Sequence, residues 1–366
     1  MEGVSVTTLT TIDEAAERGR PRDRQVNHYT ELSARVRAEG LLRRRYGYYW
    51  SKMAIVFGLL AATTVAFVMI GDSWWQLFTA VVFAILFTQA AFLGHDAAHR
   101  QIFTSGPRNE WASLLIANLV VGLSIGWWQH KHTRHHAKPN QVGSDPDIAP
   151  GPVAFTDAIA DSRRTPWGRW LTARQGWFFF PILLLEGLNL HVEGTKRVLA
   201  KAPVKRRWLE ILFLAVRLGG FVALVFWVLS PGVAFAFLGV QLGLFGLYMG
   251  ASFAPNHKGM PIVPPDAKID FLNRQVRMSR NIKGGWFIGE LMGGLNYQAE
   301  HHLFPSMPRP SLRTVQPIVR EYCAERAVPY TETSLWASYG IVVRYLNRVG
   351  LRASDPWACP LATQLR

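Results

Sequence analysis

Cysteine is scarce in this chain, whose 366 residues include only Cys323 and Cys359. Two cysteines cannot form the disulfide framework of a small secreted domain, and they are too few for a cysteine-based zinc or iron–sulfur site. We therefore expect a reducing compartment. Because 49% of the residues are hydrophobic, the composition also excludes an intrinsically disordered chain.

Positive charge is absent from two long stretches, although the chain has 40 Lys and Arg against 25 Asp and Glu. No Lys or Arg occurs between Lys52 and Arg100, or between Arg217 and Lys258. The apolar runs at residues 53–70, 74–94, 209–229 and 233–253 each approach the length of about 20 residues that crosses a bilayer. Short turns join the first run to the second and the third to the fourth. The sequence thus predicts four transmembrane helices in two hairpins.

The two hairpin turns contain no Lys or Arg, and this absence of positive charge also predicts an orientation. Lys and Arg collect in cytoplasmic loops, so we expect a multi-pass protein of the cell membrane with both termini and the basic segments in the cytoplasm. The net charge of +15 then reflects topology, and nucleic-acid binding is not expected. We expect no signal peptide. Residues 1–30 are interpreted as a poorly ordered tail, and Arg217 as a side chain that snorkels to the cytoplasmic surface.

Histidines form a first group at the end of the second apolar run. His95 and His99, in the sequence HDAAH, are four residues apart, which places both imidazoles on one face of a helix. Zinc proteases use this spacing with Glu directly after the first His, where this chain has Asp96. Alone, the pair is a weak indication of a metal site.

Two further groups repeat helical offsets, as an HxxHH sequence and a QxxHH sequence. They comprise His132, His135 and His136, and Gln298, His301 and His302. Residues three and four apart share a helix face, so each group can present side chains to two metals on one side. Imidazole suits iron, copper and zinc, so the ligand type alone does not select the metal.

In sequence order, HDAAHR, WWQHKHTRHHAKPN and NYQAEHHLFP resemble the three histidine boxes of the integral-membrane fatty acid desaturases and their related hydroxylases. The likeness covers roughly residues 50–320 and includes the two helical hairpins. The QxxHH form of the third box is similar to that of front-end and linoleoyl-CoA-type desaturases and of many bacterial acyl-CoA desaturases. The resemblance implies an oxidoreductase that desaturates a fatty acyl chain.

The resemblance also implies a ligand set for two irons. Members of the family use one more histidine after the fourth transmembrane helix, where this chain has His257. Relatives hold a water at the metal through an Asn four residues earlier, where this chain has Phe253, so Asn256 is a candidate substitute. The implied ligands are His95, His99, His132, His135, His136, His257, Gln298, His301 and His302. Asn256, His191 and Asp96 are candidates for supporting roles, and no catalytic residue beyond the metal ligands is expected.

One metal centre requires all these groups on one side of the membrane. Residues 111–128 are apolar enough to cross, but a crossing would separate His99 from His132. We therefore expect this segment to lie in the membrane interface or to re-enter the same side. Residues 177–190 are too short to cross and contain Pro181 and Glu186, so the same expectation applies.

The predicted fold is an all-α integral membrane protein with four transmembrane helices in two hairpins, interfacial helices and a cytosolic histidine-rich cap that holds a dimetal site. Residues 1–48 are assigned to a polar and basic cytosolic tail, residues 49–320 to the membrane desaturase domain and residues 321–366 to a C-terminal cytosolic segment.

The predicted function is oxygen-dependent desaturation of a long-chain fatty acyl substrate, as acyl-CoA in preference to acyl-lipid, with two irons and O2 as co-substrate. An unactivated methylene has no acidic proton and no leaving group, so a redox metal must supply the oxidant. The chain has no dinucleotide fingerprint and no HPGG haem motif. Electrons must therefore come from a separate donor, such as a ferredoxin, a cytochrome b5-like protein or an NAD(P)H-dependent reductase.

Three alternatives stay open. Hydroxylation by the same site differs only in the fate of the substrate. A membrane zinc hydrolase would use HDAAH and HxxHH as ligands. A metal or haem transporter would place ionisable residues near the middle of the spans, whereas these histidines lie at span ends and in polar segments.

Overall fold

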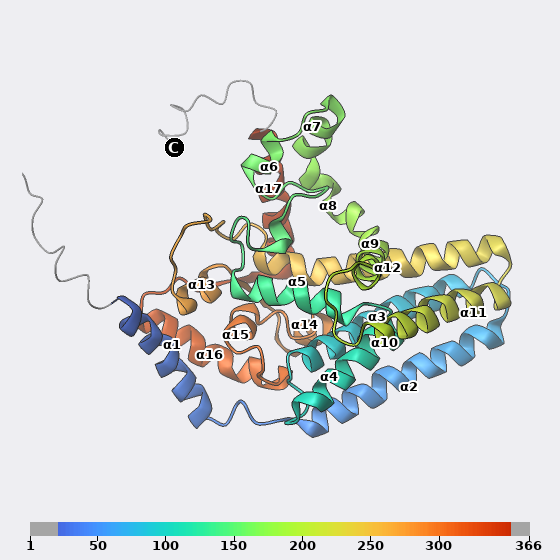
Figure 1. Cartoon of the computed structure of the whole chain (residues 1–366), viewed down its shortest axis with the longest axis horizontal. Helices are drawn as coiled ribbons and strands as arrows, with labels where there is room; N and C mark the ends of the chain where they lie inside the picture. The colour runs from blue at the N-terminus through green and yellow to red at the C-terminus, as the bar shows by residue number, and fades with distance from the viewer. Residues whose placement is uncertain (1–20, 353–366) are drawn as a thin grey trace, which may run out of the picture.

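Four long apolar helices lie side by side in the computed structural model, which describes residues 21–352 (Figure 1). They are α2 (Tyr46–Ile70), α3 (Gln76–Ala98), the continuous helix of α10 (Arg207–Leu214), η4 (Ala215–Gly219) and α11 (Gly220–Val228), and α12 (Pro231–His257). All four are long and apolar enough to span a membrane, which confirms the predicted number. All four begin or end a few residues away from the predicted bounds, and they extend beyond those bounds mainly at the end that meets the cap.

Shorter helices fill the segment between the hairpins and the segment after them. The first set is α4 (Gly106–Leu114), η2 (Leu115–Val121), α5 (Ile125–Ala137), η3 (Pro146–Ile148), α6 (Asp157–Asp161), α7 (Pro166–Ala173), α8 (Gln175–Leu183) and α9 (Glu186–Leu199). The second set is α13 (Phe271–Arg277), α14 (Gly285–Leu291), α15 (Gln298–Leu303), α16 (Arg309–Glu325) and α17 (Leu335–Arg352). Two short strands that the sequence did not predict, β1 (Arg280–Lys283) and β2 (Thr331–Ser334), pair in parallel.

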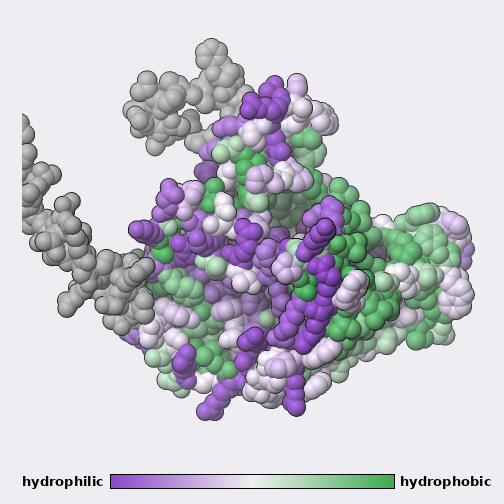
Figure 2. Space-filling model, in the orientation of Figure 1, coloured by the Kyte–Doolittle hydropathy of each residue, from purple (hydrophilic) through white to green (hydrophobic). Residues whose placement is uncertain are grey.

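On the face shown in Figure 2, hydrophobic side chains cover most of the spans, and most of the hydrophilic side chains lie over the cap. On α2, Ile55, Leu59, Val65 and Met69 are exposed, as expected of side chains that face lipid. In contrast, α3 packs against α2, α12 and η2 and is buried along much of its length. This places α3 at the centre of the span bundle and carries its last turn into the cap.

The two hairpin turns contact each other at the end of the bundle opposite to the cap. The Asp72 carboxylate accepts hydrogen bonds from the backbone N–H of Ser230 at 2.9 Å and from its hydroxyl at 3.0 Å. Gln76 donates to the carbonyls of Phe67 (2.7 Å) and Gly71 (2.9 Å) and thereby closes the first turn. The two hairpins are thus joined through their turns.

Residues 111–128 belong to two helices rather than one. The segment α4–η2 meets α5 at an angle of 116°, and Gly122 at the bend has φ 91°, a left-handed conformation that suits glycine. The Glu210 carboxylate, one helix away, accepts hydrogen bonds from Asn118 (3.1 Å) and Ser124 (2.6 Å), on both sides of the bend. The bend brings His132 back beside His99, at 2.9 Å between their Nε2 atoms, which fits the re-entrant one of the two expected arrangements.

Arg217 contributes to the same bend and does not snorkel. Its Nε donates to the carbonyl of Val120 at 2.6 Å, and its guanidinium lies over the rings of Phe87 (4.2 Å) and Phe221 (4.4 Å). A cationic side chain at the C-terminal end of a helix can donate to an otherwise unpaired carbonyl, and its charge interacts favourably with the helix dipole. Arg217 thus caps the last turn of η2.

Residues 177–190 form α8 and the start of α9, which lie against α12 without crossing. Gly187 and Gly246 are in such close backbone contact that a Cβ atom on either would collide with the other helix. Trp177, Leu185 and Leu188 remain largely exposed on the outer side. Exposed Trp and Leu beside the spans are typical of an interfacial segment, and the interfacial position of these residues stays a prediction.

The cap has its own hydrophobic core beneath the spans. Helix α1 (Pro21–Ala38) packs on α13 and α16 through Leu32 and Val36, which lie in one buried cluster with Leu272 and Tyr322. The interpretation of residues 1–30 as a poorly ordered tail is therefore wrong for residues 21–30, which are helical, and residues 1–20 lie outside the described residues.

Candidate metal centre

Seven of the predicted histidines gather in two clusters at the junction of the spans and the cap. The first cluster is His95, His99, His132 and His301, and the second cluster is His135, His257 and His302. Within each cluster the candidate ligand atoms lie within 4.8 Å of one another. The side chains come from the ends of α3 and α12, from α5 and from α15. Residues more than 200 positions apart in the sequence are thereby brought into contact.

His136 and Gln298 complete the predicted set. The Nε2 atom of His136 lies 2.9 Å from Nε2 of His132, and its ring stacks on that of His302 with centroids 4.2 Å apart. His136 thus lies between the two clusters. The Gln298 amide nitrogen is 2.8 Å from Nε2 of His257. Each of the nine side chains predicted from the histidine boxes and His257 therefore contacts another member of the set.

Local helix geometry explains how neighbouring histidines reach different clusters. On α5, His132 and His136 are four residues apart and share a face, whereas His135 is rotated towards α12. On α15, His301 faces the first cluster and its neighbour His302 the second. The paired histidines of the two boxes therefore divide between two sites.

Burial favours the neutral form of several of these imidazoles. Burial is the largest cause that lowers the pKa of His99, His132 and His302 well below the usual range, and the neighbouring histidines lower it further. Both ring nitrogens of His95, and the Nε2 atoms of His301 and His302, are buried without a hydrogen-bond partner. Neutral imidazole nitrogens are the form that binds divalent metals. The donor set fits metal ions.

In the second cluster, the Nδ1 atom of each of the three rings has a hydrogen-bond partner. The Asp145 carboxylate oxygens lie 3.0 and 3.1 Å from Nδ1 of His135. Nδ1 of His257 is 2.9 Å from the carbonyl of Met278, and Nδ1 of His302 is 2.9 Å from Oε1 of Gln275. Asp145, Gln275 and Met278 belong to none of the motifs from which the site was predicted. An available signal was the DPD sequence at residues 145–147, shortly after the second box.

The first cluster has different surroundings. Asp96 lies 3.5 Å from Nδ1 of His95, and a buried ion pair with Arg309 at 2.7 Å engages its carboxylate. The Trp128 ring stacks on His132 with centroids 4.1 Å apart. The structure thus places Asp96 beside a predicted ligand, as expected, and adds Arg309 and Trp128 to the site.

The other two candidates for supporting roles differ in position. Asn256 is buried, and its amide donates to Oε1 of Gln298 at 3.2 Å, so it lies beside the second cluster. His191 is turned away, because its Nδ1 lies 2.6 Å from the carbonyl of Gly187 and its ring lies near Phe245. The structure therefore supports a site-proximal position for Asn256 and places His191 against the α9–α12 contact instead.

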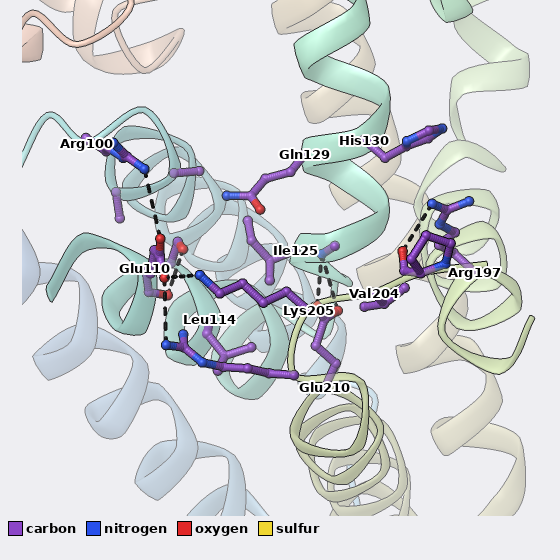
Figure 3. A pocket seen from close by; sticks show the side chains of 16 residues that line it. Arg100, Glu110, Leu114, Ile125, Gln129, His130, Arg197, Val204, Lys205 and Glu210 are labelled. Atoms are coloured by element: carbon purple, nitrogen blue, oxygen red, sulfur yellow. Dashed lines mark hydrogen bonds and ion pairs between the residues drawn. The ribbon is translucent and has the colours of Figure 1, made fainter. Parts of the chain in front are cut away.

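A cavity of about 610 Å3 opens beside the last turn of α3 (Figure 3). Four basic side chains line it, and they come from three different parts of the chain. They are Arg100, Arg197, Lys205 and Arg206. Glu110 forms ion pairs with Lys205 at 2.7 Å and with Arg206 at 3.7 Å, which leaves an excess of positive charge around the cavity.

Comparison with known proteins assigns the chain to a family. A sequence profile described as "Fatty acid desaturase" matches residues 72–334. Delta(8)-fatty-acid desaturase 2 of Arabidopsis thaliana is 30% identical over 315 residues, which cover 82% of this chain and 68% of the relative. A Delta(5) fatty acid desaturase of Caenorhabditis elegans is 29% identical over 350 residues, which cover 90% of this chain and 75% of the relative.

The name of a third relative states its substrate class. The acyl-lipid (9-3)-desaturase of Borago officinalis is 29% identical over 292 residues, which cover 76% of this chain and 65% of the relative. These names do not point to the narrower bacterial acyl-CoA type that the third box suggested. The profile match over most of the chain and the buried histidine clusters agree with one another. This chain belongs to the fatty acid desaturase family and is a multi-pass membrane oxidoreductase.

Proposed function

We propose that this desaturase holds two iron ions, one at each histidine cluster, and uses dioxygen to introduce a double bond into a long-chain fatty acyl substrate. The convergence of three separate histidine boxes into two adjoining clusters carries the proposal. A buried polar atom without a partner costs about 1–3 kcal/mol, so the unpaired ring nitrogens favour bound metal. The proposed ligands are His95, His99, His132, His135, His136, His257, Gln298, His301 and His302.

The reaction removes one hydrogen from each of two adjacent methylenes. With two electrons from a donor and two protons, these hydrogens reduce one dioxygen molecule to two waters. Two irons would supply the oxidising power that acid–base and nucleophilic side chains lack towards an unactivated methylene. The protein keeps the imidazole nitrogens convergent, and the Trp128 ring on His132 covers one side of the first cluster against water.

The basic cavity supports a substrate whose acyl chain is attached to a phosphate-bearing group. Arg100, Lys205 and Arg206 line the cavity beside the last turn of α3, close to the first cluster. A CoA thioester and a phospholipid headgroup share this chemistry. The carrier can be identified with purified enzyme in nanodiscs. The same acyl chain is supplied as acyl-CoA in one reaction and as phosphatidylcholine in another, and the double bond should form only in the chain that is attached to the correct carrier.

Electrons come from a separate protein in this proposal, and the cap faces the cytoplasm of the cell. The basic surface of the cap would attract an acidic ferredoxin-like protein, a cytochrome b5-like protein or a reductase. The support is the distribution of charge, since Lys and Arg are absent between Lys52 and Arg100 and between Arg217 and Lys258.

Expression in a desaturase-deficient host with a matched electron donor tests the proposal. Gas chromatography of the lipids should reveal new double bonds with the wild-type chain and none with His302→Ala. A hydroxy acid without an alkene would instead indicate hydroxylation. Metal analysis of the purified protein should give about two irons per chain, whereas one zinc would favour a hydrolase. Equal unsaturation with both chains would contradict the assigned site.

A further inference from the structure

We propose that Asp145 is a positioning residue that fixes His135 and makes the two metal sites unequal, so that the second cluster binds its ion more tightly than the first. This inference rests on the diiron function proposed above. Asp145 itself is not part of the histidine boxes.

The contact between Asp145 and His135 determines which ring nitrogen can bind a metal. The carboxylate is buried, and both of its oxygens lie within 3.1 Å of Nδ1 of His135. A carboxylate only accepts hydrogen bonds, so Nδ1 must carry the proton. The lone pair is then on Nε2, which points into the second cluster at 3.2 Å from Nε2 of His257. Asp145 thus presents His135 in the form and direction that a metal needs.

Asp145 is itself held rigidly by the backbone of its loop. The N–H of Asn140 donates to one carboxylate oxygen at 2.7 Å, and the N–H of Asp147 donates to the other at 2.9 Å. The Asn140 side chain also donates to the carbonyl of His257 at 3.2 Å. The loop that orients His135 therefore also contacts the backbone of a second proposed ligand, which couples the two rings.

The neighbouring acid, Asp147, lies 3.4 Å from the same Nδ1 of His135 but has a closer partner in a lysine. Asp147 pairs with Lys131 at 2.8 Å, and its backbone carbonyl accepts a hydrogen bond from Lys258 at 2.8 Å. Two ammonium groups and a protonated Nδ1 disfavour a third cation among His135, Asp145 and Asp147, although their ligand atoms are close together. The group therefore supports a ligand and is not a further metal site.

The first cluster lacks an equivalent support at His95. Asp96 is the nearest acid, but it is 3.5 Å from Nδ1 of His95, and Arg309 engages its carboxylate at 2.7 Å. Neither ring nitrogen of His95 has a hydrogen-bond partner. Loss of a group that orients a ligating histidine lowers metal affinity by about 10- to 100-fold. The difference between His135 and His95 therefore predicts two sites of different affinity.

Cobalt titration of the metal-stripped, full-length protein tests this inference. Co2+ binding is followed by its visible absorption bands, and the number of bound ions by plasma mass spectrometry. Wild type should bind two ions in two distinguishable steps. Asp145→Asn, which keeps one acceptor, should weaken the tighter step by about tenfold, and Asp145→Ala by up to about 100-fold, with the weaker step unchanged.

Asp270→Asn is the matched control. The Asp270 carboxylate also accepts a backbone N–H, from Asn273 at 3.0 Å, but it caps α13 and contacts no cluster histidine. This variant should titrate like wild type. A tight step that survives unchanged in both Asp145 variants would overturn the inference, as would a loss in the weaker step alone. Wild type that binds no cobalt would instead contradict the proposed dimetal function, so the two failures can be told apart.

Discussion

The two histidine clusters share a residue type and two supporting helices, α5 and α15, but they differ in what surrounds the rings. All three histidines of the second cluster are buried and have Nδ1 hydrogen bonded to Asp145, Met278 or Gln275. In the first cluster, His99 and His132 are only half-buried, and an aromatic ring and an ion pair adjoin it. The same ligand motif can therefore form a buried site with hydrogen-bonded rings, as in the second cluster, and a more exposed site, as in the first.

The single variants His301→Ala and His302→Ala each remove a histidine from one cluster and leave the other cluster complete. Each change removes a proposed ligand from a different cluster, so each should lower desaturation by more than about 100-fold, beyond the effect expected for a residue that only supports a ligand. Lipid analysis measures the product, and plasma mass spectrometry should show a loss of about one metal per chain. His28→Ala is the control, because His28 lies on α1, outside both clusters and away from the basic cavity. Full activity in either variant would contradict the assignment.

Arg309→Met tests the ion pair beside the first cluster. The change leaves the buried Asp96 carboxylate without its partner, which should lower the free energy of unfolding by about 3–5 kcal/mol. Thermal unfolding in detergent measures the effect. Arg326→Met removes an exposed pair with Glu31, which water and salt screen, so its effect on the unfolding temperature should be much smaller. Equal losses in the two variants would show that Asp96 does not depend on Arg309.

Gly122→Ala should weaken both clusters together. The new methyl group would be held at φ 91° and would approach Leu218 to 2.8 Å, so we expect a loss of about 1–2 kcal/mol of stability. The bend directs α5, which supplies ligands to both clusters. Cobalt titration should show both steps weakened to a similar extent. A loss confined to one cluster would indicate that the bend does not set the position of α5.

Gln298 offers the smallest and most selective change. Gln298→Ala should reduce metal affinity of the second cluster by about tenfold or less, because an amide is a weak ligand and three histidines remain. Gln298→His should recover or exceed wild-type affinity, since imidazole is the common donor in this site. The same cobalt titration separates these outcomes, and identical binding by the three proteins would remove Gln298 from the ligand set.

The span pattern was predictable because bilayer thickness imposes a length and an apolar composition that are visible in the sequence. The re-entrant bend was not predictable in detail. Residues 111–128 have the composition of a crossing helix, and the bend depends on the Glu210 carboxylate and on Arg217, which lie about one hundred residues further along the chain. Helix α1 was also missed, because its polar residues resemble a tail until Leu32 and Val36 meet the cap.

For the candidate site, helical offsets and ordered motifs indicated which side chains would converge, including His257. The bracing residues lacked comparable signals. Asp145 follows its histidine by ten residues, in a loop whose shape depends on a contact with Val263. Met278 acts through a backbone carbonyl, which any residue type would supply. His191 has a residue type that can bind metal, but its Nδ1 lies against the carbonyl of Gly187 in its own helix. The sequence could not show this, because helix periodicity does not specify which other elements a helix face will contact.

The hydrogen bonds between Asp72 and Ser230 have a consequence at the opposite end of the molecule. Each helix rises about 1.5 Å per residue, whereas metal–ligand bonds tolerate deviations of about 0.2 Å. A slip of one residue between the hairpins would therefore separate His257 on α12 from the ligands that follow α3. By joining the two turns, this contact helps to align the hairpins along their axes, at the end of the bundle opposite to the metal clusters.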